Sequence, residues 1–392
     1  MRTFLSFPAI ERLFTSRLLE IAPRLIPTMP NRQLKGDLQD DIGLDSIEIM
    51  ELAAYFHGKF HMMELGTDVY LLSSRRVEDW LIRIHQAAND FHLPITFFTS
   101  GSTGEPKACQ HDKKWLLQEC ESWGDILQNT NKLWGSVSPR HIYGFIFTLL
   151  LPDQLDCTIE GVPKENLIRF IKEAAKGDVF IGFPDLYQFL GNSFKTLPAG
   201  ITAISSTAKL PFLTGKRLSA HGMEVMEIYG SSETGGIGYR MFPENAYTLL
   251  PFWKKKAHQL QRRSTHHNEK LIDLPDNLSW LGDGQFQLST RKDHAVQVGG
   301  NNVFPLQIQN KISSIPGVKN CWVRKMNPQQ GSRLKCWIQT DISSKEWKKL
   351  ETISYSWIES HLTPPERPKH IQVASHAPLN EMGKVQDWPL IE

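Results

Sequence analysis

The chain has almost no excess of charge of either sign. Its 44 lysines and arginines are balanced by 42 aspartates and glutamates, which leaves a net charge of +2 over 392 residues. A protein whose main task is to coat nucleic acid usually carries a strong basic excess. The charge balance therefore argues against that class.

Long hydrophobic runs are missing as well. The longest, residues 143–151, is far shorter than the roughly 20 residues that a membrane-spanning helix needs. The first residues are interrupted by Pro8 and Glu11 and contain no small-residue cleavage site, which makes them a poor signal peptide. We therefore expect no membrane contact and no secretion.

Cysteine is scarce and unpatterned. There are five cysteines, an odd number, and no two have CxxC spacing. This argues against a disulfide scaffold and against a zinc knuckle, and it favours reduced thiols in a cytoplasmic protein. The cysteines are Cys109, Cys120, Cys157, Cys321 and Cys336.

The sequence changes character twice along its length. At roughly 150 residues per domain, the chain has room for two or three domains. Residues 1–90 are typical of helices, residues 91–291 alternate short apolar strands with helices, and residues 292–392 are typical of a smaller α+β unit. The expected strands are residues 95–99, 178–183, 201–206, 223–230, 295–298, 318–325 and 333–340. The expected helices are residues 10–21, 77–84, 113–123, 164–175 and 344–361, with another beginning at Ser46.

The most informative segment is the string TSGSTGEPK at residues 99–107, directly after an apolar strand. Glycines let backbone N–H groups approach a ligand, hydroxyl groups donate hydrogen bonds, and Lys107 supplies positive charge. The string therefore suits a loop that binds a polyphosphate, although it is not a Walker A loop. A flexible Ser/Gly turn is the alternative, and the preceding strand and closing lysine favour the phosphate loop.

This string resembles the phosphate loop of the adenylate-forming enzymes, which include acyl-CoA synthetases, aryl-CoA ligases and the adenylation domains of peptide synthetases. Further strings follow in that family's order, so the resemblance covers about three quarters of the chain. They are HIYG (141–144), SSTAKLP (205–211), YGSSE (229–233), RKD (291–293), GGNNVFP (299–305) and PLNEMGKV (378–385). The form of the hinge strings is similar to phenylacetate-type aryl-CoA ligases. The compact layout resembles the AMP ligases of bacterial aryl-polyene pigment clusters.

The resemblance implies a role for each string. Lys384 would bridge the substrate carboxylate and the α-phosphate, on a lid domain that rotates about Asp293 for the second half-reaction. Glu233 would hold Mg²⁺ together with Thr103. The implied catalytic residues are Lys384, Glu233, Ser232 and Lys107. The implied ATP-binding residues are Thr99, Ser100, Gly101, Ser102, Thr103, Gly104, Tyr229, Gly230, Asp276 and Arg291. The implied acid pocket contains His141, Tyr143, Gly144 and Phe145.

Two aspartates compete for the ribose-binding position of the family. Counting back about fifteen residues from Arg291 leads to Asp276, which follows Pro275 instead of the family's usual glycine. Asp283 follows a glycine, but its position fits a tight turn with Gly284. We favour Asp276 and keep Asp283 as the alternative.

The N-terminal segment contains the string DIGLDSIE at residues 41–48, which resembles the phosphopantetheine attachment site of carrier proteins. In that site a serine, here Ser46, begins a helix and bears the prosthetic arm. Residues 31–90 hold eleven acidic and six basic residues, as in an acidic carrier. An Asp–Ser pair is also a common helix N-cap, so an unmodified, carrier-like fold is the alternative. The basic residues 254–256, with 262–263, could dock an acidic carrier or CoA phosphates, or form a solvated charge run.

The resemblance thus implies an α/β adenylate-forming core at residues 91–291, a small α+β lid at 292–392 and an all-α carrier-like domain at 1–90. It implies ATP-dependent activation of a carboxylic acid, such as 4-hydroxybenzoate or a cinnamate-like acid, to supply a starter unit for aryl-polyene or polyketide-type biosynthesis. The acyl group would pass to CoA or to 4′-phosphopantetheine, either on Ser46 or on a separate acyl carrier protein. ATP and Mg²⁺ are the implied cofactors. Aryl-CoA ligases of this compact type are often dimers, and the sequence leaves the oligomeric state, monomer or homodimer, open. A non-catalytic protein that binds acyl-adenylate or a carrier is the alternative.

Overall fold

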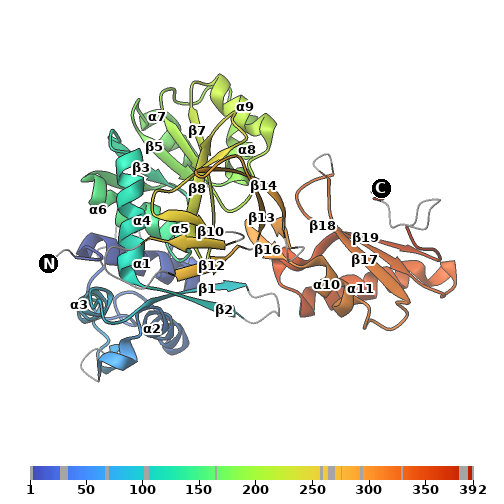
Figure 1. Cartoon of the computed structure of the whole chain (residues 1–392). Coiled ribbons are helices and arrows are strands. Elements are labelled where there is room, and N and C mark those ends of the chain that lie inside the picture. The colour runs from blue at the N-terminus through green and yellow to red at the C-terminus, as the bar shows by residue number, and fades with distance from the viewer. Residues whose placement is uncertain are drawn as a thin grey trace. The chain divides into compact units, whose positions relative to one another are not determined.

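The computed structural model describes most of the chain, and its contacts divide it into two compact units (Figure 1). Unit 1 contains residues 1–99, 106–274 and 278–288, and unit 2 contains residues 100–105, 275–277 and 289–392. The described residues are 3–26, 34–66, 70–100, 106–163, 166–256, 259–263, 270–274, 276–291, 295–327, 330–378 and 387–390.

Unit 1 begins with three predicted helices, all of which are confirmed. They are α1 (Phe7–Ile21), α2 (Ser46–Phe60) and α3 (Val77–Ala88). A capping box starts α2: the Asp45 carboxylate accepts the backbone N–H groups of Ile47 and Glu48, and the Glu48 side chain accepts the N–H of Asp45. The Asp–Ser pair therefore does act as a helix start.

Among the described residues, these helices do not form a hydrophobic core of their own. Their buried side chains belong to the same core as those of the following α/β part; the Phe4 ring, for example, stacks on the ring of Phe145 at 6.0 Å. Residues 3–99 accordingly cluster with the α/β part in unit 1. The contact division thus differs from the predicted separation at residue 90, and the carrier-like character of the segment stays a prediction.

The centre of unit 1 is a mixed sheet in the order β13-β14-β9-β8-β7-β6-β5-β3-β4. From β4 to β7 the strands are parallel, whereas β8, β9 and β14 continue antiparallel. The strands are β3 (Lys132–Gly135), β4 (Thr158–Gly161), β5 (Val179–Gly182), β6 (Thr202–Ser205), β7 (Glu224–Ser231), β8 (Gly235–Met241), β9 (Tyr247–Leu249), β13 (Asp276–Trp280) and β14 (Gln285–Arg291). The predicted strands at 178–183, 201–206 and 223–230 are confirmed, as is the α/β class of this part.

Helices alternate with the parallel strands, as the sequence predicts. They are α4 (Lys113–Ile126), α5 (Ile142–Phe145), which continues as a π-helix (Ile146–Leu150), α6 (Leu151–Leu155), α7 (Leu167–Glu173), α8 (Pro184–Ser193) and α9 (Phe212–Ala220). Two smaller sheets complete the unit. The first pairs β1 (Ile95–Ser100) with β2 (Pro106–His111), and the second contains β10 (Trp253–Lys256), β11 (Gln259–Arg262) and β12 (Lys270–Asp273).

Arg262, part of the predicted basic stretch, is not a solvated charge. Its side chain is buried, its guanidinium lies 4.3 Å from the Phe252 ring centroid, and it donates to the Trp115 carbonyl oxygen at 2.5 Å. Burial lowers its pKa to about 10. The interpretation of this residue as a docking or surface charge is therefore wrong.

Unit 2 is a small α+β fold. Strand β18 (Leu334–Gln339) pairs antiparallel with β17 (Asn320–Lys325) and parallel with β19 (Pro368–Ala374). Helices α10 (Pro305–Ile312) and α11 (Trp347–His361) share its core, and β15 (Val296–Val298) forms a hairpin with β16 (Asn301–Val303). The predicted strands and helix of this region are confirmed. None of the helices in the described ranges is both long and apolar enough to cross a membrane.

Candidate active site

The turn between β7 and β8 holds the clearest constellation of predicted site residues. Glu233 lies in this turn, and its Oε1 atom is 2.9 Å from Nζ of Lys107 on β2. Both side chains are about half exposed, at 45% and 58%, so the pair is accessible to a ligand. Burial alone would raise the pKa of Glu233, but the hydrogen bond from Lys107 and further hydrogen bonds outweigh it and lower that pKa. The pair thus places a carboxylate and an ammonium group together at the surface of unit 1.

Two buried residues that the sequence analysis missed hold this turn in place. The His111 ring hydrogen-bonds through Nε2 to the backbone carbonyl of Ser232 at 2.7 Å. Glu119, from α4, accepts the backbone N–H of Gly236 at 2.8 Å. Burial raises the pKa of the Glu119 carboxyl, and its Oε2 has no hydrogen-bond partner in the described part of the chain. His111 comes four residues after Lys107, a spacing that could have indicated its position beside the loop.

Two positions of the turn require glycine because neighbouring atoms lie too close to leave room for a Cβ atom. Gly235 has a φ of +72°, and a Cβ atom there would overlap the Glu119 carboxylate. A Cβ atom on Gly230 would overlap the carbonyl oxygen of Gly235, at the point where the β7–β8 register shifts. The predicted ATP-binding glycine Gly230 therefore has a structural reason to lack a side chain.

The turn lies at the carboxyl edge of the parallel strands, where ligands of open α/β sheets commonly bind. Strand β6 ends nearby, and Thr207 just beyond it has a φ of +76°. This conformation is strained for a β-branched residue, and such strain clusters at functional sites. Glu227 supports the same loop, since its Oε1 accepts the N–H of Leu210 at 3.2 Å. This supports the interpretation of residues 205–211 as part of the site.

The predicted adenine-stacking residue, Tyr229, is largely buried. Its ring is 8% exposed and makes edge contacts with the rings of Tyr247 and Phe286, at 6.0 and 5.8 Å between centroids. The structure therefore shows a packing role for this ring, and its stacking on adenine stays a prediction.

The predicted acid-pocket residues have different surroundings. Phe145 is fully buried in the core, and a Cβ atom on Gly144 would overlap the Ser138 carbonyl oxygen. The Tyr143 hydroxyl lies 3.0 Å from the carbonyl oxygens of both Gly182 and Ile204, at the ends of β5 and β6. The hydroxyl of Tyr143 is thus committed to the backbone, and burial raises its pKa.

His141 is the member of this group that reaches the surface. Although His141 is an exposed residue, partial desolvation of its ring and, after it, the positive charges of Arg140 and Lys59 lower the pKa of the imidazole to about 4. The ring is therefore neutral near pH 7, and its Nε2 faces the Arg140 guanidinium at 3.4 Å.

Several predicted residues lie outside the described residues or are described only through their backbone. Gly101, Ser102, Thr103, Gly104, Asp293 and Lys384 lie outside, and Thr99, Ser100 and Arg291 are described only as strand residues. Asp276 starts β13, whereas Asp283 is exposed in the turn between β13 and β14. This confirms the predicted tight turn at Asp283 and leaves the ribose role of Asp276 a prediction.

The carboxylate of Glu233 fits a Mg²⁺ ion that arrives with ATP. Magnesium prefers oxygen ligands and is often held by one or two carboxylates plus substrate phosphates. No group of three or more His, Cys, Asp or Glu side chains in the described ranges could hold a metal ion without such phosphates. Glu233 would therefore supply the protein's carboxylate ligand, and the half-exposed Lys107 beside it would face the phosphates.

Comparison with known proteins shows the family to which the chain belongs. The family model described as AMP-binding enzyme matches residues 65–258. A 4-coumarate–CoA ligase of Halorhodospira halophila is 31% identical over 349 residues, which is 88% of this chain and 88% of that protein. The chain belongs to the AMP-binding enzyme family. It is thus an AMP-forming ligase of the same family as that relative.

Other AMP-binding enzymes support the assignment. A 4-coumarate–CoA ligase of Rhodobacter capsulatus is 31% identical over 373 residues, covering 92% of this chain and 94% of that protein. A solved double mutant of o-succinylbenzoate CoA synthetase from Bacillus subtilis has a TM-score of 0.58 at 15% identity, covering 74% of this chain and 67% of that one. The structural likeness shows that the chain has the adenylate-forming fold.

We expect Glu233→Gln to weaken the use of MgATP. The amide keeps the shape of the side chain but loses the charge that Mg²⁺ and Lys107 require, so kcat/KM for MgATP should fall by about 100-fold. The measurement is acid-dependent ATP–pyrophosphate exchange over a range of Mg²⁺ concentrations. Glu224→Gln, exposed at the other end of β7, is the matched control and should behave as wild type. Equal MgATP kinetics in both variants would remove Glu233 from the site.

Proposed function

We propose that this enzyme activates a small carboxylic acid with ATP and then transfers the acyl group to a thiol. The observation that carries the proposal is the Lys107–Glu233 pair, placed at the carboxyl edge of the parallel strands in a member of the AMP-binding enzyme family. A cation for phosphate and a carboxylate for the metal are what binding of a nucleoside triphosphate requires.

In the first half-reaction, an oxygen of the acid's carboxylate attacks the α-phosphorus of ATP. The bond from that phosphorus to the bridging oxygen breaks, and its electron pair leaves with pyrophosphate. No general base is needed, because the acid arrives ionised. Lys107 would neutralise phosphate charge, while bound Mg²⁺ would add positive charge at the pyrophosphate. Lys384 would bridge the attacking carboxylate and the α-phosphate.

In the second half-reaction, a thiolate attacks the acyl carbon and AMP leaves with the electron pair of the acyl–oxygen bond. CoA and the phosphopantetheine arm of an acyl carrier protein present the same thiol. The relatives named 4-coumarate–CoA ligase favour CoA as the acceptor and an aryl acid, such as a cinnamate-like acid or 4-hydroxybenzoate, as the substrate. Supply of aryl starter units for polyene biosynthesis is consistent with such a product.

Ser46 is the position at which the enzyme would carry a phosphopantetheine group of its own. The serine is exposed at the first turn of α2, and the neighbouring Ile47 and Met50 are 72% and 53% exposed. These exposed apolar side chains support access by a modifying enzyme. The capping box at Asp45 accounts for the Asp–Ser pair without modification, so a separate acceptor is the simpler arrangement.

The test is an exchange assay with a panel of acids. We expect aryl acids with a propenoate side chain to support ATP–pyrophosphate exchange at least about tenfold better than fatty acids of similar size, since one pocket discriminates by shape and polarity. CoA and a phosphopantetheine-loaded carrier protein are then compared as acceptors by mass spectrometry. Binding of ATP and acid without exchange for any acid would favour a non-catalytic binding protein instead.

A further inference from the structure

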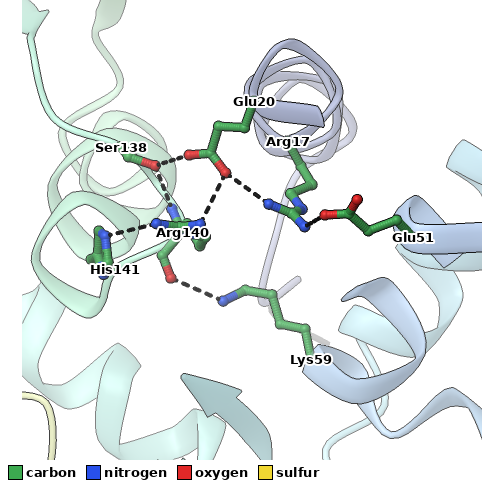
Figure 2. Close-up of polar contacts among 7 residues, drawn as sticks. All are labelled: Arg17, Glu20, Glu51, Lys59, Ser138, Arg140 and His141. Atoms are coloured by element: carbon green, nitrogen blue, oxygen red, sulfur yellow. Dashed lines mark hydrogen bonds and ion pairs between the residues drawn. The ribbon is translucent and has the colours of Figure 1, made fainter. Parts of the chain in front are cut away.

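A polar cluster joins the N-terminal helices to the segment that presents His141 (Figure 2). Glu20 on α1 is at its centre: its Oε1 accepts from the Ser138 hydroxyl at 3.0 Å, and its Oε2 lies 3.3 Å from Nη1 of Arg140. Arg17 binds both Glu20 on its own helix, at 3.1 Å, and Glu51 on α2, at 2.6 Å. Helix α1 is therefore tied directly to residues 138–141, and α2 is tied to α1 through Arg17.

Lys59 reaches the same turn from α2 and is buried. Its side chain is 1% exposed, and its Nζ lies 4.0 Å from the Phe97 ring centroid and 5.0 Å from that of Phe145. In the described part of the chain, its one hydrogen bond goes to the Arg140 carbonyl oxygen at 3.5 Å. Cation–π contacts offset part of the free-energy cost of burying the charge. Two N–H donors of the ammonium group have no hydrogen-bond partner among the described residues, so a net cost of burial remains.

The charges around Lys59 add to that cost. Burial and, after it, the positive charge of Arg140 lower the pKa of the Lys59 ammonium from 10.5 to about 7. The acidic groups facing the cluster, Glu20 and Glu51, are paired with Arg17 and Arg140. A methionine has a similar volume and would fill the space beside the Phe97 and Phe145 rings without a charge. Packing alone therefore does not explain a lysine at this position.

The turn that Lys59 and Glu20 hold leads directly into the predicted acid-binding residues. Arg140 precedes His141, which caps α5, and the next turn of that helix contains Gly144, packed against the Ser138 carbonyl. A shift of Ser138 or Arg140 therefore moves the His141 ring. Because the backbone carbonyl of Arg140 and its guanidinium are bound from two different helices, the turn has little freedom.

We propose that Lys59 and Glu20 are positioning residues for acid binding: they fix residues 138–141 so that the His141 ring faces the carboxylic acid substrate. The inference rests on the proposed function and extends it to the N-terminal helices, which become part of the acid-binding half of the site. Neither residue touches the reacting atoms in this arrangement. Their effect is on the affinity for the acid and not on ATP.

The test compares Lys59→Met with Lys113→Met in the full chain. Lys113 is a second buried lysine of unit 1, which donates to the carbonyl oxygens of Ala87 and Asp90 far from the turn in sequence. We expect Lys59→Met to raise the KM for the acid about tenfold or more, with the KM for ATP within about twofold of wild type. Lys113→Met should leave the KM for the acid unchanged.

The folding stability of Lys59→Met separates positioning from packing. Between pH 7 and 10.5 the unfolded wild type binds the proton that the folded state has lost, so wild-type stability rises with pH in that window. The methionine variant escapes this penalty. Its melting temperature should exceed that of wild type by about 5 °C at pH 6–7, and the difference should vanish towards pH 10.5. Loss of a residue that serves only packing would lower the stability of the protein. A Lys59→Met variant that is more stable but binds the acid more weakly therefore supports a positioning role.

The variants Glu20→Ala and Glu20→Gln test the positioning role of Glu20 in the same way. The alanine variant should raise the KM for the acid as Lys59→Met does, whereas glutamine keeps an acceptor for Ser138 and should restore most of the affinity. Hydrogen exchange of peptides covering residues 136–145 should be faster in Lys59→Met and Glu20→Ala than in wild type or Lys113→Met. An unchanged KM for the acid, with unchanged exchange of these peptides, overturns the inference. A wild type that shows no acid-dependent turnover would overturn the proposed function instead, and the hydrogen-exchange result distinguishes the two failures.

Discussion

Lys384→Ala should abolish most of the first half-reaction. A lysine between the carboxylate and the α-phosphate reduces the repulsion between an anionic nucleophile and an anionic phosphate, and this help is greatest in the transition state. We expect acid-dependent ATP–pyrophosphate exchange to fall about 1000-fold, with little change in the KM for ATP.

The second half-reaction provides the internal control for Lys384. Acyl-adenylate supplied to the variant should still react with the thiol at close to the wild-type rate, because the resemblance places Lys384 away from the site in that step. Lys369→Ala, which removes an exposed lysine from β19 of the same unit, should leave both half-reactions intact. Unchanged exchange in Lys384→Ala would show that another group neutralises the charge.

In unit 2, a buried lysine of strand β18 binds two residues close to the C-terminus, Asp387 and Trp388. Lys335 is fully buried on β18, and its Nζ lies 2.6 Å from both the Asp387 carboxylate and the Trp388 carbonyl oxygen. The Trp388 ring in turn packs against the Trp337 ring at 5.8 Å. Asp387 and Trp388 are thus attached to the central strand of the small sheet.

Much of the fold could be predicted because its signals are local in sequence. Apolar strands such as residues 178–183, the Asp283–Gly284 turn and the helix start at Ser46 each depend on a few neighbouring residues. Lys107 and Glu233, more than a hundred residues apart, were assigned to one site only through the family resemblance. The structure shows them 2.9 Å apart.

Other features could not be predicted because they depend on residues distant in sequence. The segment beginning at Trp253 looks like a charge run, yet it is strand β10, paired with β11, in which Arg262 is buried. Lys59 has the sequence context of an ordinary helical lysine, and only the packing of Phe97 and Phe145 around it reveals a buried charge. The alternation of apolar and polar residues and the amino-acid composition do not reveal such aromatic surroundings of a charged group.

Deletion of residues 1–92 should prevent unit 1 from folding. The helices share one hydrophobic core with the α/β part, so deletion would expose the faces of Phe97 and Phe145 that they cover. It would also remove the Ala87 and Asp90 carbonyls that now accept the hydrogen bonds of the buried Lys113 ammonium. Each large apolar side chain lost from a core costs about 2–5 kcal/mol, and a domain has only about 5–15 kcal/mol to lose. The remaining chain should be insoluble, or soluble without a cooperative thermal transition.

A chain that ends at residue 288 is the matched control, because it removes residues 289–392, the longest segment of unit 2. It should unfold cooperatively near the temperature of unit 1 in the full chain, measured by circular dichroism. The two deletions remove similar lengths of chain, so a difference between them reports the shared core. A separable carrier domain makes the opposite prediction: residues 93–392 would then fold and exchange pyrophosphate without the helices. That result would also contradict the positioning role of Glu20 and Lys59, since both lie in the deleted segment.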